Sequence, residues 1–506
     1  MDPILIEHRL IKTSVAMWVS SIVTLIIQLA SVPICLHFWG YNTYGMWLTI
    51  LAAFTIMRTA DYGYVLYVGN EINILYHNDQ NAMRLNLASA IWGILILGVL
   101  QLLFLIIIYA GNSIHVIIGS QSSYSYNEIF QALLIMSVCW ICSASYMGIV
   151  HRILNPLGML YQSTWMMMWL QVVQFIAIIT AAIINLSLVY TAILFSLVQL
   201  ISYIASAIYI KKALPQYFPW WKNSSPKVGL KNIINSLPQT LGWMMTQGGI
   251  NGIILLIASF LGPAAVPIFT TLRTISNLWI ILINSFTQPV IPDAVRFYAT
   301  GKPHKLISIN QVHGILISGV VNLSLLMIYP FIEKIFTVWT GNHLYFDRIL
   351  LNLLLATISI SGMSALMGAF LAGINNVGYI IISSALRGVL VLILGWALLP
   401  KYGMPGLGMA IFIAEILNLL VINIWFLTLE KGGGKLIMRH LEWSWFSTIS
   451  VTAYLIAQCY KLHYISFIYW TSILMVLTCT LGAWLDLHHT FKSRVIFLIQ
   501  KHGWRK

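Results

Sequence analysis

AVPIFTTLRTISNLWIILINSFTQPVI, from Ala265 to Ile291, is an apolar run with the length of a membrane-crossing helix and a polar stripe along one side. A helix needs about 20 apolar residues to cross a bilayer. At about 100° per residue, Arg273, Asn277, Asn284 and Gln288 fall within about 60° of one another, over about 22 Å of helix. A charge at that depth is costly unless it faces protein or water. The stripe therefore predicts a wet internal path for a polar or anionic ligand.

The composition of the whole chain agrees with a membrane protein. Of its 506 residues, 59% are hydrophobic and 8% are charged, whereas soluble proteins average about 25% charged residues. The apolar runs have the length of helices rather than of barrel strands. We expect an all-α polytopic membrane protein with about fourteen transmembrane helices. Their expected centres are Thr24, Leu51, Val99, Cys139, Val172, Ser196, Gly248, Leu278, Val320, Ser361, Val389, Asn418, Ser450 and Leu474.

The distribution of basic residues predicts the topology. If the N-terminus is cytoplasmic, most Lys and Arg residues fall in cytoplasmic loops, which is the general bias of membrane proteins. The net charge of +14 is then explained without a nucleic-acid partner. We expect a multi-pass protein with both termini in the cytoplasm and a retained first helix. On the opposite side lie only Lys334, Arg348, Lys401 and Lys461.

An internal repeat predicts the domain organisation. The pattern Met147-Gly148 with Asn155 and Gly158 recurs 220 residues later as Met367-Gly368 with Asn375 and Gly378, and the segment at Phe38 corresponds to that at Phe260. We expect two pseudo-symmetric six-helix bundles, as in transporters with parallel repeats. Their boundaries are residues 1–210 and 232–430, with an interfacial linker at 211–231 and two extra helices and a tail at 431–506.

The C-terminal segment His488–Lys501 carries apolar residues on one helical face and basic residues beside them. We interpret it as a short helix on the inner membrane surface, with a solvated tail as the alternative.

The chain lacks the motifs of common enzymes. It contains no paired carboxylates, HExxH, GxSxG or phosphate-binding loop. Cys139 and Cys142 lie in an apolar run without a second pair, which favours packing over zinc or redox chemistry. We therefore expect neither an enzyme nor a resident cofactor or metal ion.

A few charged residues lie deep in the membrane runs. Arg58 and Asp61 share a helical face at spacing i, i+3. Either they form a structural ion pair, or Arg58 binds an anionic cargo while Asp61 tunes it or takes a proton. Arg273 has no acidic neighbour in its own helix, so it either lines a lumen or packs between helices.

Three further positions complete the candidate binding set. Gln247 and Asn251 continue a polar pattern along the preceding helix. Arg387 and Glu415 are candidates for a second ion pair, and Glu415 is also a candidate coupling site, because a desolvated carboxylate can hold a proton.

The segment LHFWGYNTYGMWLTILAAFTIMRTADYGY, from Leu36 to Tyr64, resembles polysaccharide exporters of the multidrug, oligosaccharidyl-lipid and polysaccharide (MOP) exporter superfamily. The resemblance lies in Gly40, in Tyr44-Gly45-Met46-Trp47 and in Ala60-Asp61-Tyr62-Gly63, with Leu399 to Gly403 as a further match. The branch that it resembles most is that of the O-antigen flippases.

This resemblance implies a function. Such a flippase moves an undecaprenyl-diphosphate-linked oligosaccharide, an O-antigen or related surface polysaccharide unit, from the cytoplasmic to the periplasmic leaflet of the bacterial inner membrane. The resemblance also implies alternating access through a cationic central cavity. Arginines would contact the diphosphate, Asn and Gln would contact the sugars, and the lipid tail would stay in the membrane. Polysaccharide polymerase and chain-length regulator proteins would be its partners.

Two other functions remain open at this stage. A cation-coupled multidrug or organic-cation antiporter of the same superfamily would prefer a cavity of net negative charge. A membrane polysaccharide polymerase or glycosyltransferase usually needs a sizeable outer loop, and the longest outer segments here are short.

Overall fold

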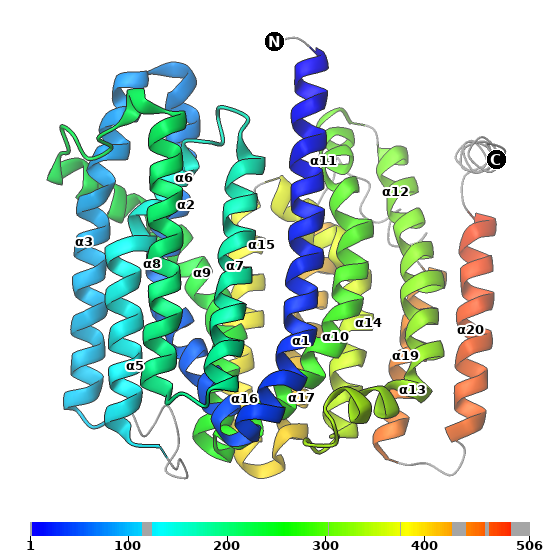
Figure 1. Cartoon of the computed structure of the whole chain (residues 1–506). Helices are drawn as coiled ribbons and strands as arrows, with labels where there is room; N and C mark the ends of the chain where they lie inside the picture. Colours follow the sequence, from blue (N-terminus) through cyan, green and yellow to red (C-terminus); the bar gives the residue numbers. More distant parts are fainter. Residues whose placement is uncertain are drawn as a thin grey trace, which may run out of the picture. The chain divides into compact units, whose positions relative to one another are not determined.

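The computed structural model describes residues 3–113, 124–301, 303–374, 376–427, 442–460 and 465–486, and these residues form helices and no strands. Among these described residues, twelve helical segments are long and apolar enough to cross a membrane. The first of them, Lys12–Met57, contains two expected spans, and α19 supplies one that falls outside the twelve. The prediction of an all-α polytopic membrane protein with about fourteen transmembrane helices is confirmed (Figure 1).

The described chain divides into two compact units. Unit 1 is Met1–Pro267 with Trp339–Leu344, and unit 2 is Ile268–Val338 with Tyr345–Lys506. The elements up to Ala265 are α1 (Pro3–Met57), α2 (Thr59–Asn78), α3 (Gln80–Ala110), α5 (Tyr126–Cys139), η1 (Trp140–Ser145), α6 (Tyr146–Arg152), α7 (Leu160–Ile183), α8 (Leu188–Ala213), η2 (Pro215–Tyr217), α9 (Pro226–Leu261) and η3 (Pro263–Ala265).

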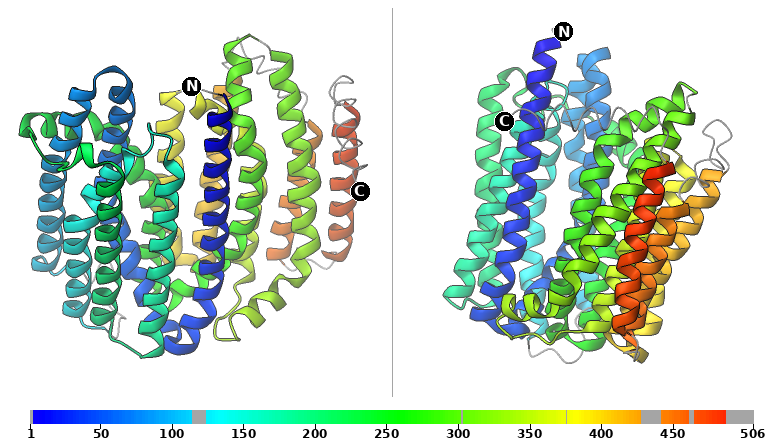
Figure 2. Two further views of the ribbon diagram at one scale, coloured as in Figure 1. Left: turned by 45° about the horizontal axis from the view of Figure 1, so that its top comes forward. Right: turned by 90° about the vertical axis from the view of Figure 1, so that its right-hand side faces the viewer.

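The elements after Ala265 include two helices, α19 and α20, that lie side by side (Figure 2). These elements are α10 (Val266–Thr287), η4 (Gln288–Val290), α11 (Ile291–Ala299), α12 (Pro303–Leu316), η5 (Ile317–Asn322), α13 (Leu323–Trp339), α14 (Arg348–Gly373), α15 (Val377–Ala385), η6 (Leu386–Leu390), α16 (Val391–Tyr402), α17 (Met404–Leu427), α19 (Glu442–Cys459) and α20 (Ile465–Asp486).

Two glycines form matching corners. Inside α1 the chain turns at Gly40, where φ is 70° and ψ is 175°. Gly262, at the equivalent place in the repeat, has φ 82° and ψ 160° between α9 and η3. Backbone of this kind is open mainly to glycine, because a Cβ atom would clash there. The two segments that the repeat aligns therefore share a backbone conformation as well as a position.

Close helix contacts in unit 1 depend on small residues. A Cβ atom built on Gly63 of α2 would lie 2.4 Å from the Cα atom of Thr240 in α9. A Cβ atom on Gly45 of α1 would lie 1.9 Å from the carbonyl oxygen of Pro263. α9 thus packs inside unit 1, although the repeat groups it with the second bundle. The division into bundles 1–210 and 232–430 stays a prediction.

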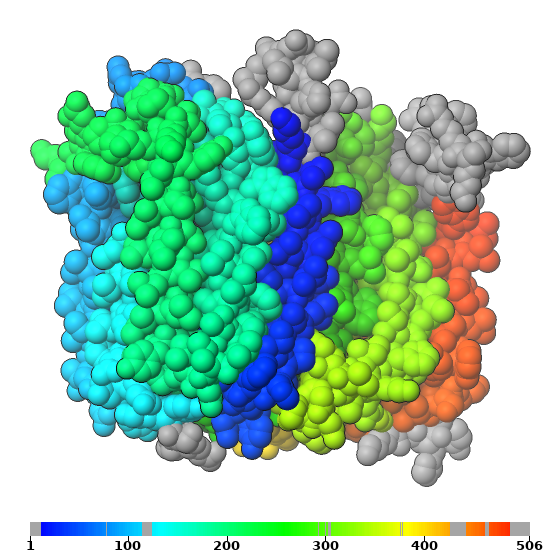
Figure 3. Space-filling view, in the orientation of Figure 1, coloured from blue at the N-terminus to red at the C-terminus, as the bar shows by residue number. Residues whose placement is uncertain are grey.

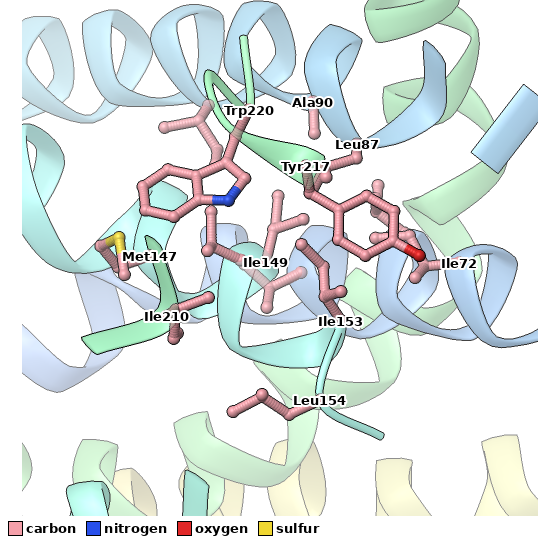
Figure 4. Packing of buried hydrophobic residues seen from close by; sticks show 14 of the residues in the cluster. Ile72, Leu87, Ala90, Met147, Ile149, Ile153, Leu154, Ile210, Tyr217 and Trp220 are labelled. Carbon is pink, nitrogen blue, oxygen red and sulfur yellow. The ribbon is translucent and has the colours of Figure 1, made fainter. Parts of the chain in front are cut away.

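The expected linker, residues 211–231, is partly helical and partly buried. Lys211 and Lys212 belong to the last turn of α8, and α9 begins at Pro226. Between these helices, Tyr217 and Trp220 join the hydrophobic core of unit 1. Figure 4 shows the two rings above Ile149 and Ile153, with Ile72 and Leu87 beside Tyr217. The connection is therefore anchored by aromatic burial, which contributes about 1.5–3 kcal/mol for a large side chain.

Figure 3 shows the face of unit 1 on which α1, α7 and α8 lie. α1 and α7 lie in contact along it, and α8 lies on the other side of α7. Exposed large side chains such as Trp18, Ile22 and Trp169 lie on these helices. Apolar side chains on the outside are expected where lipid replaces water as the solvent.

In unit 2, a polar network holds α19 against the other helices. Asn322, at the end of the π-helical turn η5, donates to the hydroxyls of Ser447 and Thr448 in α19. It accepts a hydrogen bond from Ser359 of α14. Hydrogen bonds of this kind between membrane helices contribute about 0.6–2 kcal/mol. The network explains how one of the two extra helices is joined to unit 2.

The tail segment His488–Lys501 lies outside the described residues, as do Asn375 of the repeat and the basic residues of 428–441.

Candidate functional site in unit 1

A cavity of about 610 Å³ lies entirely within unit 1. Its walls come from the end of α1, α2, the η1–α6 segment, α7, α8 and α9. The volume lies within the range of about 300–1,000 Å³ that is typical of ligand sites. The polar and aromatic lining is Thr55, Arg58, Thr59, Asp61, Tyr62, Trp140, Ser145, His151, Arg152, Asn155, Ser163, Gln171, Gln174, Gln199, Tyr203, Trp243 and Gln247.

Asp61 is fully buried at the cavity wall, and three donors bind its carboxylate. The Gln101 amide donates to Oδ1 at 2.7 Å. The Trp140 indole and the Ser145 hydroxyl donate to Oδ2 at 2.8 and 3.0 Å. Trp140 and Ser145 are the two ends of η1, so this π-helical turn presents both donors to one carboxylate. Single π-helical turns often occur at functional sites.

Arg58 stands between α1 and α2, where the regular helix is interrupted. Its guanidinium lies 5.1 Å from the Trp140 ring centroid and 5.6 Å from that of Phe54. Among the described residues, no ion pair joins Arg58 to Asp61. The structural ion-pair interpretation of these two residues is therefore wrong, because the carboxylate bonds to neutral donors and the guanidinium stacks on aromatic rings.

A second guanidinium on the same cavity belongs to Arg152, at the end of α6. Its stem passes Gly69, where an added Cβ atom would lie 2.8 Å from Cγ of Arg152. Arg152 forms no ion pair with any described carboxylate. The preceding residue, His151, is buried, and neither of its ring nitrogens has a hydrogen-bond partner.

Amide and aromatic side chains form the rest of the wall. Gln174 donates to Gln199 at 3.3 Å, and Gln171 accepts from Thr24 of α1. The rings of Tyr62 and Trp243 meet edge to face at 4.6 Å between centroids. Amides match hydroxyl groups as both donors and acceptors, and aromatic faces match apolar C–H surfaces. This combination suits a sugar.

Of the sequence-predicted residues, three lie on this cavity: Arg58, Asp61 and Gln247. Asn251 lies one turn further along α9 and donates to Gln247 at 2.9 Å. It does not itself line the cavity.

The polar stripe of Arg273, Asn277, Asn284 and Gln288 lies on α10 and η4, which belong to unit 2 over these residues. Arg273 and Asn277 are half-buried, whereas Asn284 and Gln288 are exposed. The Arg273 guanidinium lies 5.8 Å from the Phe269 ring centroid. The buried residues Ile275, Trp279 and Ile283 lie on another side of the helix. The stripe therefore does not belong to the packed interior of unit 2, and its role in cargo binding stays a prediction.

Arg387 and Glu415 form a bidentate ion pair in unit 2, as one of the two interpretations expected. Arg387 donates to the carboxylate at 3.0 and 2.6 Å. Glu415 is 6% exposed, and Asn418 completes the cluster next to it. Glu415 is thus not a lone carboxylate. Roles of the pair in cargo binding or ion coupling stay predictions.

Several cavity residues were missed by sequence reasoning. Gln101, Trp140 and Ser145 come from helices far from Asp61 in the chain, and no spacing rule connects them. Arg152 is one of the basic residues that the topology prediction places in cytoplasmic loops. The repeated pattern around Met147-Gly148 and Asn155 was the available signal for this wall. Within the described residues, no cluster of His, Cys, Asp or Glu could hold a metal ion.

The chain has the fold shared by transporters of the MOP superfamily. Its structure is similar to that of the lipid II flippase MurJ in an inward closed conformation, with a TM-score of 0.61 and 17% identity over 94% of this chain and 99% of that chain. It is also similar to an inward-facing multidrug resistance MATE family transporter of that superfamily, with a TM-score of 0.58 and 15% identity over 84% of this chain and 99% of that chain.

A MATE structure in a bent conformation matches with a TM-score of 0.52 and 15% identity over 86% of this chain and 96% of that chain. No family sequence model matches the chain. No curated protein matches its sequence. At these identities the similarity concerns the fold, so the choice among cargoes depends on the site.

Proposed function

We propose that this chain is a flippase that moves an undecaprenyl-diphosphate-linked oligosaccharide, an O-antigen or related surface polysaccharide unit, from the cytoplasmic to the periplasmic leaflet of a bacterial inner membrane. The charge of the unit 1 cavity is the observation that supports this proposal. Two guanidinium groups, Arg58 and Arg152, line it without an ion pair among the described residues, and the carboxylate of Asp61 is occupied by neutral donors.

Each part of such a cargo has a chemical counterpart. Guanidinium groups bind phosphate oxygens through paired, charge-assisted hydrogen bonds. The amides of Gln171, Gln174 and Gln199 and the rings of Tyr62 and Trp243 suit hydroxyl groups and sugar faces. The lipid tail stays in the bilayer, so the protein needs to shelter only the headgroup.

Residues outside the unit 1 cavity complete the proposal. In unit 2, we assign cargo contacts to Arg273, Asn277, Asn284, Gln288 and Arg387, as the sequence predicts. Asn251 supports Gln247 on α9. Asp61 and Glu415 remain the proposed ion-coupling carboxylates, and alternating access is the proposed mode of transport. Polysaccharide polymerase and chain-length regulator proteins are the proposed partners.

The alternative, an antiporter for organic cations, is less well supported by the same lining. The cavity carries two guanidinium groups against one carboxylate, which repels a cationic drug and attracts an anion. An acidic excess would have favoured the antiporter.

A flipping assay tests the proposal. Purified protein is placed in liposomes with a fluorescent undecaprenyl-diphosphate-linked saccharide, and dithionite reduces only the label on the outer leaflet. Arg58→Ala should lower the flipping rate about 10-fold or more, because a charge-assisted hydrogen bond contributes about 1.5–3 kcal/mol. Arg273→Ala should do the same if the α10 stripe contacts the cargo.

The control is Arg296→Ala, which removes an exposed arginine paired with Asp293 outside the cavity. It should flip at the wild-type rate. Wild-type protein that leaves the inner-leaflet label protected would refute the flippase proposal, and equal rates in Arg58→Ala and wild type would remove Arg58 from the site.

A further inference from the structure

His151 is a buried histidine whose ring the fold leaves unsatisfied. It is 5% exposed, and neither Nδ1 nor Nε2 has a hydrogen-bond partner. Buried polar groups nearly always have partners, and an unpaired one costs about 1–3 kcal/mol. Since His151 lines the unit 1 cavity, a ligand in that cavity is a source of the missing partner.

The groups around His151 are mainly cationic or neutral. Its ring lies 6.1 Å from the ring of Tyr203 in α8, and Arg58 is within electrostatic reach of the Tyr203 hydroxyl. Arg152 is the next residue in the chain. The described lining from η1, α7 and α9 contains no titratable group, and α2 contributes Tyr62 and Asp61.

The acidic and remaining basic neighbours do not supply the hydrogen bonds that the His151 ring lacks. Asp61 of α2 is the carboxylate on this cavity, and three hydrogen bonds occupy it. On α3, which also packs against α6, Arg84 lies over the Tyr217 ring. In the empty cavity, the His151 ring therefore has no anionic partner among the described residues.

We propose that His151 completes a diphosphate subsite with Arg58 and Arg152, and that its ring takes up one proton from water as the diphosphate enters. This inference rests on the proposed function. A diphosphate brings at least two negative charges, which stabilise an imidazolium, and both nitrogens of an imidazolium donate hydrogen bonds. The step forms one N–H bond on the ring and breaks one O–H bond of a hydronium ion, which becomes water.

The proposal links cargo binding to protons. The cargo binds more tightly as the pH falls, and its release returns the proton. His151 is then a proton site that responds to the cargo itself, in addition to the proposed ion-coupling carboxylates Asp61 and Glu415.

Calorimetry on the full chain in lipid nanodiscs tests this linkage. Undecaprenyl diphosphate is titrated at one pH in two buffers of different ionisation enthalpy, which gives the number of protons taken up. Wild type should take up about one proton more than His151→Gln. When the titration is repeated one pH unit lower, the Kd of wild type should fall about 10-fold more than that of the variant. Comparison with the variant cancels the titration of the ligand itself.

The matched control is His313→Gln in unit 2. His313 is 4% exposed like His151, but it has a partner, Thr287. This control should take up as many protons as wild type. If His151→Gln fails to fold, His151→Asn replaces it, because its amide occupies the position of Nδ1.

Inorganic pyrophosphate forms a second arm. If pyrophosphate causes the same proton uptake, the subsite binds the diphosphate alone. If only undecaprenyl diphosphate causes it, the subsite requires a diphosphate that is attached to the lipid. Equal uptake in wild type and His151→Gln overturns the inference and leaves the flippase proposal standing. If wild type does not bind undecaprenyl diphosphate, both are overturned.

Discussion

Asp61 illustrates, at the scale of single residues, what a spacing rule can and cannot predict. The sequence identified a deep carboxylate and suggested Arg58 as its partner at i, i+3. The structure instead surrounds it with Gln101, Trp140 and Ser145, which lie 40, 79 and 84 residues away. The choice among partners is tertiary, and the break in the helix at Arg58 directs the guanidinium to the rings of Phe54 and Trp140.

The ion pair between Arg387 and Glu415 allows a residue-scale prediction. Arg387→Met should lower the free energy of unfolding by about 1–3 kcal/mol, because it leaves the buried carboxylate of Glu415 without its cationic partner. The double variant Arg387→Met/Glu415→Leu should recover most of that loss, since apolar pairs often replace buried ion pairs at little cost. Thermal melting in detergent measures both.

The control for this prediction is the exposed ion pair of Arg348 and Glu333, whose side chains are 45% and 53% exposed. Arg348→Met should cost less than about 1 kcal/mol, as exposed pairs usually do. Equal losses at the two sites would mean that burial does not distinguish them.

At the scale of elements, each apolar run of the sequence corresponds to a helix of the structure, because a bilayer fixes the length of a crossing helix. The sequence did not predict the three π-helical turns, η1, η5 and η6. A π-helical turn changes the register of a helix without changing its composition or its apolar length. It is therefore invisible to hydropathy, although η1 presents two of the donors to Asp61.

The contact between α2 and α9 gives a prediction at this scale. Gly63→Ala should lower the melting temperature in detergent, because its methyl group would lie 2.4 Å from the Cα atom of Thr240, and such overpacking costs about 1–3 kcal/mol. Gly242→Ala, in α9 itself, is the matched control: nothing lies within 4 Å of an added Cβ atom there.

Gly242→Ala should leave the melting temperature unchanged or raise it slightly, since alanine is favoured over glycine in a helix by about 1 kcal/mol. If Gly63→Ala melts like Gly242→Ala, the two helices are not in the close contact described here.

At the scale of the whole molecule, the basic residues predict the topology. In unit 1, the start of α1, the α2–α3 connection and the α8–α9 connection lie at the same end (Figure 1). Apart from Arg58, which lies near the middle of its span, the Lys and Arg residues of this unit lie toward that end. We propose that this end is cytoplasmic, in agreement with the bias of membrane proteins.

Cysteine labelling measures the topology. In a chain whose five native cysteines are replaced, Lys222→Cys, between α8 and α9, should react with a membrane-impermeant maleimide only in inverted vesicles. Tyr345→Cys, at a 75% exposed position between α13 and α14, should react in intact spheroplasts. Reaction of Lys222→Cys from outside would reverse the proposed orientation.

The fold was largely predictable from the sequence, and the cavity was predictable only in part. Helix number follows from apolar length, which is local. The cavity depends on which faces of distant helices meet, so Arg58, Asp61 and Gln247 could be proposed, but His151 and Arg152 could not. A histidine at the end of an apolar run carries no local signal of its burial.

The matching corners at Gly40 and Gly262 have a consequence for the history of the gene. A tandem duplication keeps the second copy in the orientation of the first only if each copy crosses the membrane an even number of times. The predicted six spans per copy would satisfy that condition, and the second copy would then inherit the corner unchanged. On this proposal, Gly40 and Gly262 are corresponding positions of the two copies.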